Sequence, residues 1–168
     1  MKKFTKIFLI NLPLIDGFIL KSGSPSSGIT HVKIYAVLEN APVVERGASM
    51  FGRYIKDSFW HLAIEDDDKL KNAEIRKHFL RKLYVLADFR ENTGNNIVNL
   101  VEFHSRQKMM LKAYNQSLMR LMGNIVANHS RKPYCVVHNK YREQLLNAMV
   151  RPQHVETILM FYRIPWLL

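Results

Sequence analysis

Small and hydroxylated residues gather between positions 22 and 28, which read Ser-Gly-Ser-Pro-Ser-Ser-Gly. Small side chains allow successive backbone N–H groups to point into one space, and such a nest can hold an anion. The segment lacks the Gly-Lys-Ser/Thr ending of a phosphate-binding loop. The pattern therefore supports an anion nest only weakly, and an ordinary serine-rich loop remains an alternative.

A second candidate site lies at His104, Arg106 and Lys108. On a helix, His104 and Lys108 are one turn apart, whereas Arg106 lies about 200° around from His104. The helix alone therefore cannot bring all three into one tight site. Arg106 and Lys108 could contact phosphates. An acid–base role for His104 beside Glu102 is a weaker alternative. The third alternative is a solvated basic helix surface with Phe103 in the core.

Several kinds of site are excluded by composition. The chain has one cysteine, Cys135, so it has no intrachain disulfide and no metal or iron–sulfur site built from several of its own cysteines. Its histidines have no metal-ligand spacing, and neither an H-E-x-x-H helix nor a G-x-S-x-G elbow is present. We expect no metal site, and we expect Cys135 to be a small buried hydrophobic residue.

The chain is basic, and its charge is unevenly distributed. It has 168 residues, 48% of them hydrophobic, and a net charge of +11. Residues 97–168 hold 10 Lys/Arg and 3 Asp/Glu, a net of +7 in the shorter part. This balance is consistent with a polyanionic partner, and a solvated cationic helix surface is an equally good alternative. Since no apolar run approaches the roughly 20 residues of a membrane span, we expect a cytoplasmic protein without a membrane partner.

Hydrophobic spacing predicts an α+β fold that is mostly helical. The apolar residues 7–15 resemble a signal peptide, but Pro13 and Asp16 interrupt them, so we expect a buried strand start there. Residues 65–68 are expected to form a solvated acidic loop, and residues 91–96 are the clearest break. Strands are expected at 18–20 and 32–37, and helices at 50–60, 72–90, 97–128, 137–150 and 154–162.

The first half resembles part of a known family. Residues 16–28 and the following strand 32–35 are similar to the end of the thiouracil-desulfidase-like domain of unknown function, which has a K-S-x-S-P-S-C-G loop followed by a V-K-V-Y strand. Residues 47–51, the acidic stretch ending at Leu70, and residues 75–79 match later segments of that family. The resemblance thus covers residues 16–94 as a partial domain and leaves residues 1–15 unmatched.

The second half resembles another family that is often fused behind the first. Residues 100–111 read LVEFHSRQKMML and are similar to the L-V-E-F-H-x-R-x-K-L-L-L signature of the YbgA-like helical domain of unknown function. Gly123 and residues 126–127 match its later L-G-x-x-V-A. The fold implied is a small α/β remnant (16–94) followed by a partial YbgA-like helical domain (95–168).

The resemblance implies a chemistry that this chain has lost. Members of the first family hold a four-iron four-sulfur cluster through three cysteines, and one open iron takes the sulfur of a thiolated uracil. Fused forms resemble transfer RNA desulfidases whose helices are the RNA-binding part. Here Ser27 stands at the loop cysteine, and the region of the other two cysteines is missing. Ser24 and Ser26 match the family's loop serines at its catalytic site.

We therefore expect a truncated, inactive remnant without a cofactor. His104, Arg106 and Lys108 would retain a basic surface for transfer RNA or another RNA. The alternative is a helical interaction or structural protein of unknown role. Because half of a domain is missing, we also expect self-association, or a partner chain that covers exposed apolar surface.

Overall fold

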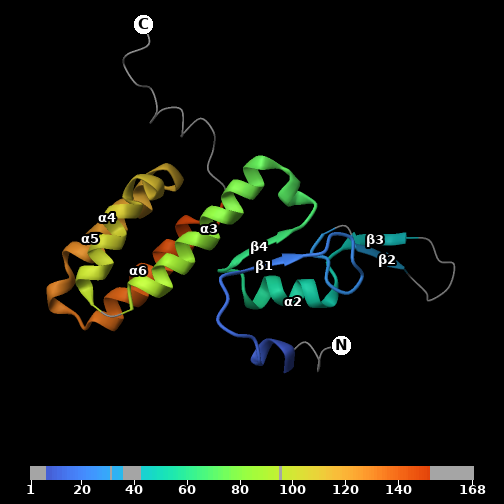
Figure 1. Cartoon of the computed structure of the whole chain (residues 1–168), viewed down its shortest axis with the longest axis horizontal. Helices are drawn as coiled ribbons and strands as arrows, with labels where there is room; N and C mark the ends of the chain where they lie inside the picture. Colours follow the sequence, from blue (N-terminus) through green and yellow to red (C-terminus); the bar gives the residue numbers. More distant parts are fainter. Residues whose placement is uncertain (1–6, 31, 36–42, 95, 152–168) are drawn as a thin grey trace, which may run out of the picture. The chain divides into compact units, whose positions relative to one another are not determined.

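The computed structural model describes residues 7–30, 32–35, 43–94 and 96–151. The chain divides into two compact units, Met1–Tyr84 and Val85–Leu168, and the division falls within one helix, α3. The fold is mostly helical with small sheets, which confirms the predicted class. The elements in chain order are β1 (Gly17–Leu20), β2 (Val32–Tyr35), β3 (Val43–Gly47), α2 (Met50–Ser58), β4 (Ala63–Asp66), η1 (Lys69–Lys71), α3 (Ala73–Asn92), α4 (Ile97–Tyr114), α5 (Gln116–Ala127), η2 (His129–Arg131) and α6 (Tyr134–Ala148) (Figure 1).

The first unit is built on a short parallel pair of strands. β1 pairs with β4 in a register that sets Gly17 opposite Ala63 and Leu20 opposite Asp66. α2 runs alongside β1 (Figure 1), and Ile55 packs with Leu20 in a small apolar core. β2 and β3 form a separate antiparallel pair. The predicted strands at 18–20 and 32–35 are confirmed, while residues 36 and 37 lie outside the described residues.

Local capping sets the helix starts in this unit. Ser49 begins α2, because its Oγ accepts a hydrogen bond of 2.9 Å from the backbone N–H of Gly52. Asn72 begins α3, and its Oδ1 accepts from Glu74 N at 2.9 Å and from Ile75 N at 3.3 Å. Such caps satisfy N–H groups that have no partner inside the helix. Both predicted helices are confirmed, with ends shifted by about two residues.

Two expectations about the first unit are wrong. Residues 7–10 form a helical turn instead of a strand start, and Ile10 and Leu14 are more than 80% exposed. Residues 65–68 are not simply a solvated loop, because Glu65 and Asp66 close strand β4 and Asp66 is fully buried. Pairing with β1 carries this acidic end into the interior, where hydrogen-bond donors from another loop meet it.

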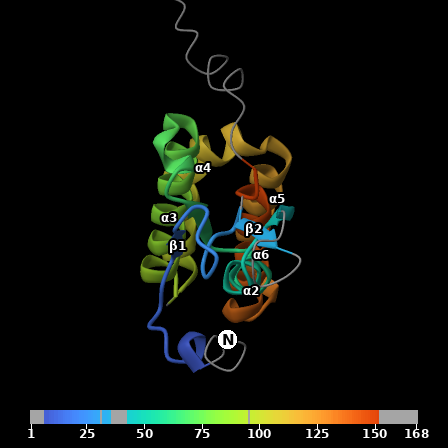
Figure 2. The same cartoon turned by 90° about the vertical axis from the view of Figure 1, so that its right-hand side faces the viewer.

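The second unit is a helical bundle. α4 packs against α5, and α5 packs against α6 (Figure 2). Fully buried side chains from all three helices form one core, which includes Leu100, Phe103, Leu111, Met122 and Leu145.

The expected single helix over 97–128 is in fact two helices. Asn115 separates α4 from α5 with an extended backbone (φ −159°, ψ 104°), and its Oδ1 accepts from Leu118 N at 2.9 Å. The asparagine ends one helix and caps the next, so the chain reverses into a helical hairpin. Leu121 on α5 is 40% exposed.

α6 begins three residues earlier than expected. Pro133 precedes its first turn, as the fixed φ of proline favours. Cys135 lies in this first turn and is exposed, so its expected burial is wrong. In place of Cys135, the nearby Val137 is buried in the core. The helix predicted at 154–162 lies outside the described residues.

A buried threonine ties the end of α3 to α6. Thr93 is fully buried, and its Oγ1 donates to the carbonyl oxygen of Phe89 at 2.5 Å. The same oxygen lies 3.0 Å from Nε2 of His138, whose ring stacks on Phe89. The hydroxyl of Tyr134 donates to the carbonyl oxygen of Thr93. The end of α3, near the break predicted at 91–96, is thus anchored in the bundle core.

Candidate functional site

The serine-rich loop leaves the carboxyl end of β1, where parallel sheets usually place ligand-binding loops. It folds back on itself as a compact turn. Gly28 N donates to the carbonyl oxygen of Ser24 at 2.9 Å, and Ser27 N donates to Ser24 Oγ at 3.4 Å. The hydroxyls of Ser24 and Ser26 lie 3.0 Å apart. The three candidate serines are therefore brought together.

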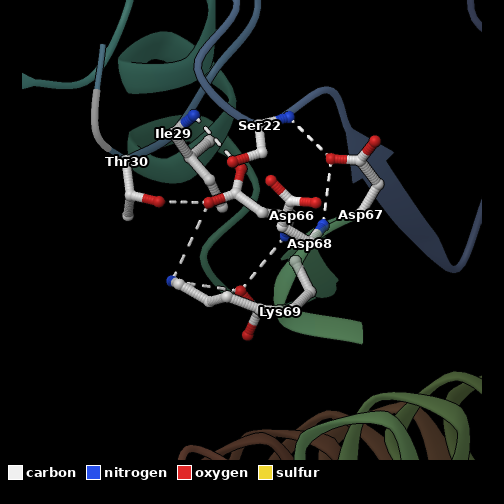
Figure 3. Close-up of polar contacts among 8 residues, drawn as sticks. Ser22, Ile29, Thr30, Asp66, Asp67, Asp68 and Lys69 are labelled. Carbon is white, nitrogen blue, oxygen red and sulfur yellow. Dashed lines mark hydrogen bonds and ion pairs between the residues drawn. The ribbon is translucent and has the colours of Figure 1, made fainter. Parts of the chain in front are cut away.

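Two carboxylates hold the ends of this loop (Figure 3). Asp67 Oδ1 accepts from Ser22 N at 2.7 Å. The buried carboxylate of Asp66 accepts from Ile29 N at 3.4 Å and from the hydroxyl of Thr30. Anionic acceptors form the stronger class of hydrogen bond with such donors. The N–H groups of Ser22 and Ile29, which an external anion would use, thus already donate to carboxylates of the chain itself.

Lysines balance the charge of this acidic segment. Lys21 Nζ lies 2.6 Å from Asp67 Oδ2, and this contact, together with the N–H of Ser22, lowers the pKa of Asp67. The same carboxylate raises the pKa of Lys21. Lys69 Nζ lies 3.2 Å from Glu65 Oε1 and 3.9 Å from Asp66 Oδ2. Asp67 therefore stays ionised at neutral pH and keeps its hold on the loop.

A close backbone contact seats the loop on α2. Ser49 N donates to the carbonyl oxygen of Gly28 at 2.8 Å. A Cβ on Gly52 would lie 2.5 Å from that same oxygen, so only glycine fits there. The loop therefore covers the start of α2.

The loop does not fit an iron–sulfur cluster. Its side-chain donors are the hydroxyls of Ser24, Ser26 and Ser27, whereas such clusters are held by thiolates. The carboxylates of Asp66 and Asp67, bound to the loop's N–H groups, would also repel a sulfide-rich group. Cys135 belongs to the other unit.

His104 faces the core of the helical unit instead of solvent. It is 9% exposed, and its Nδ1 lies 3.0 Å from the hydroxyl of Tyr141. Gly123 of α5 leaves room for the ring, since a Cβ there would lie 3.3 Å from His104 Nε2. Burial, followed by the charge of Lys108, lowers the pKa of His104. Its ring is therefore neutral at pH 7 and offers no positive charge to a phosphate.

Arg106 and Lys108 are exposed, whereas His104 is buried. Arg106 Nη2 forms an ion pair with Asp88 Oδ1 at 2.9 Å, while Lys108 is exposed. Arg106 thus lies on another side of α4 from His104, as the helix geometry predicts, whereas the charge of Lys108, one turn away, acts on the His104 ring. Glu102 is exposed on the same helix, whereas the hydrogen-bonding partner of His104 is Tyr141.

A polar cleft in the helical unit was not foreseen from the sequence. It has a volume of about 470 Å³ and is lined by Asp88, Asn92, Asn99, Glu102 and Arg106. The residues fall at i, i+4 on α3 and at i, i+3, i+7 on α4, so each set shares one helix face. That spacing is the only sequence signal for the cleft, because the pairing of the two helices is a long-range property.

Part of the chain matches a known protein family. A family model described as "Protein of unknown function (DUF1722)" matches residues 108–162. This match lies within the region expected to be YbgA-like and is consistent with such a domain. No curated protein and no solved structure matches the chain.

Two kinds of feature are absent from the described part of the chain. No helix there is both long and apolar enough to cross a membrane. In those same ranges, no three His, Cys, Asp or Glu side chains are grouped so that they could hold a metal ion.

Proposed function

We propose that the chain binds structured RNA, such as transfer RNA, through exposed cations of its helical unit, and that it does not desulfidate thiolated uracil. The supporting observation is a group of exposed side chains that we call the free cations. Within residues 85–94 and 96–151, each of them is without a carboxylate at ion-pair distance. They are Lys108, Arg120, Lys132, Lys140 and Arg142.

Unpaired cations are suited to phosphate. A Lys or Arg that neutralises a phosphate releases a condensed counterion, which supplies a large share of the binding free energy. A cation already held by a carboxylate contributes less, and in this unit Arg106 is held by Asp88 and Arg90 by Glu91. The proposal therefore moves the main RNA contacts from His104 and Arg106 to the free cations, and it retains Lys108.

The proposed loss of desulfidation rests on donor chemistry. The chain has a single cysteine, while the resembling family uses three for its cluster. The hydroxyl of Ser27 is a poor replacement for a thiolate. The serine loop is thus proposed to be a structural remnant, held by Asp66 and Asp67.

Salt-dependent binding tests the proposal. We would measure the affinity for transfer RNA by fluorescence anisotropy between about 50 and 200 mM salt. Lys108→Gln with Lys140→Gln should reduce the slope of log affinity against log salt by about two, one for each phosphate contact. The matched control, Lys33→Gln with Lys56→Gln, removes the same charge from exposed sites in the first unit and should leave the slope nearly unchanged.

Two outcomes would contradict the proposal. A slope near zero for the wild-type protein would exclude a phosphate-binding surface. Equal loss of slope in the two double variants would show that only net charge matters.

A second candidate function is that of a helical interaction protein. Val98 and Met109 on α4 are 58% and 64% exposed, and Val136 on α6 is 48% exposed. Exposed apolar side chains of this size suit a protein partner or a second copy. This candidate predicts self-association in light scattering and no binding to RNA, so the same preparation distinguishes the two functions.

A further inference from the structure

We propose that the cleft between the end of α3 and α4 binds the vicinal diol of a terminal ribose. The cleft is lined by Asp88, Asn92, Asn99, Glu102 and Arg106 and has a volume of about 470 Å³, within the range of small-molecule sites. The inference rests on the proposed function only for the nature of the polymer, an RNA, that carries this ribose.

Asp88 fixes the back of the cleft. Its Oδ1 accepts from Arg106 Nη2 at 2.9 Å and from Asn92 Nδ2 at 2.8 Å. Its Oδ2 accepts from Gln107 Nε2 at 3.0 Å. Three donors thus occupy this carboxylate and hold the Arg106 guanidinium in place. Asp88 is therefore a positioning residue and has little capacity left for a ligand.

Glu102 and Asn99 provide the groups open to a ligand. Within the ranges that the structure describes, neither side chain forms a hydrogen bond or an ion pair, although the backbone N–H of Asn99 donates to Asn96. Glu102 offers two acceptor oxygens, and Asn99 offers one acceptor and two donors. Arg106 uses Nη2 on Asp88 and keeps N–H groups for the opening, where its side chain is half exposed.

The composition of the lining selects among ligands. A nucleobase needs an aromatic or apolar surface to stack on, and all five lining side chains are polar. A phosphate would meet the carboxylate of Glu102, while the charge of Arg106 is already offset by Asp88. A metal ion would find the oxygens of Asp88 occupied by N–H donors. A neutral group with both donors and acceptors remains.

A ribose diol has this character. Its two adjacent hydroxyls can both donate to one carboxylate, as an acidic side chain accepts from ribose in dinucleotide-binding folds. Their oxygens can accept from Asn99 and Arg106. Inside an RNA chain the 3′ oxygen is esterified, so a free diol occurs only at the 3′ end or in a nucleoside. The cleft is thus assigned to the 3′ end of an RNA, and the free cations are assigned to its phosphates.

The first test uses small probes and does not depend on RNA binding. Titration with adenosine is expected to shift backbone amide NMR signals of residues 88–106, whereas 2′,3′-dideoxyadenosine should not. Glu102→Gln keeps the side chain's size and should abolish the shifts. Glu143→Gln, an exposed carboxylate on α6, changes the net charge equally and should retain them. Equal shifts from both nucleosides, or no shifts from either, would overturn the inference.

The second test uses RNA. Transfer RNA with an intact 3′ ribose should bind about 100-fold more tightly than the same RNA ending in a 2′,3′-dideoxynucleotide, since two hydrogen bonds to a charged group are lost. Equal, salt-dependent binding of both RNAs would overturn the inference and leave the proposed function standing. Absence of binding to either RNA, with adenosine still bound, would overturn the proposed function alone.

Discussion

Replacement of Asp66 should release the serine loop from the rest of the first unit. Its carboxylate is fully buried and accepts from the N–H of Ile29 and the hydroxyl of Thr30. Asp66→Ala leaves both donors without a partner. Asp66→Asn keeps one oxygen for Ile29 N, and the hydroxyl of Thr30 can rotate to accept from the new amide.

The size of the effect follows from these contacts. An unsatisfied buried N–H costs about 1–3 kcal/mol. Thr30 is only half-buried and can recover a bond to water. Lys69 Nζ lies 3.9 Å from Asp66 Oδ2, and the lysine side chain is 37% exposed. Loss of this ion pair adds about 0–1 kcal/mol to the cost of the substitution. We therefore expect the free energy of opening the loop to fall by about 2–4 kcal/mol in Asp66→Ala and by about 1 kcal/mol in Asp66→Asn.

Hydrogen exchange measured by mass spectrometry is the suitable assay, since it reports opening of the loop itself. A loss of 2–4 kcal/mol corresponds to a fall in protection of about 30- to 1,000-fold for peptides that span residues 21–30. Asp57→Ala removes an exposed carboxylate from α2 and serves as the matched control. Peptides from α4 should exchange as in the wild-type protein.

Two results would refute this reasoning. Unchanged protection of residues 21–30 in Asp66→Ala would show that the carboxylate does not hold the loop. Equal loss of protection in Asp66→Ala and Asp57→Ala would show a general charge effect.

Three further predictions concern the helical unit, each checked by the midpoint of urea unfolding. Tyr141→Phe leaves the buried Nδ1 of His104 without its partner and should cost about 1–3 kcal/mol, whereas Tyr84→Phe at a site 69% exposed should cost almost nothing. Burial lowers the pKa of His104 and of His138 from the ordinary value of 6.5, so the unfolded state binds more protons. The contribution of these histidines to stability should be full above pH 6.5 and fall as the pH drops below it. Equal unfolding midpoints at about pH 7.5 and pH 5 would contradict this. Asn115→Ala removes the cap between α4 and α5 and should cost about 0.5–2 kcal/mol; an unchanged midpoint would show that packing alone sets the hairpin.

Features with a local cause could be predicted from the sequence. The Asn72 cap and the alternation at 32–35 each act through neighbours a few residues away, so the elements they define could be predicted. The pattern of Phe103 and Leu100 also placed the correct face of α4 in the core.

Features with a distant cause could not be predicted. Asn115 reads equally well as a surface residue of a long helix, and only the packing of α4 on α5 selects the break. Asp66 belongs to an acidic run, and its burial depends on donors from a loop far earlier in the chain. The polar cleft likewise depends on which faces of α3 and α4 meet. His104 was found as a candidate, but its contact with Tyr141 arises from another helix.

The attachment of the serine loop to β4 has a consequence for the order of folding. Ser22 and Asp67 are 45 residues apart, and Ile29 and Asp66 are 37 apart, so these bonds close long loops at a high entropic cost. The α4–α5 hairpin joins helices that are adjacent in sequence, and such local contacts form faster. During synthesis the serine loop leaves the ribosome before its acidic partners. Its bonds to Asp66 and Asp67 can therefore form only after β4 is made.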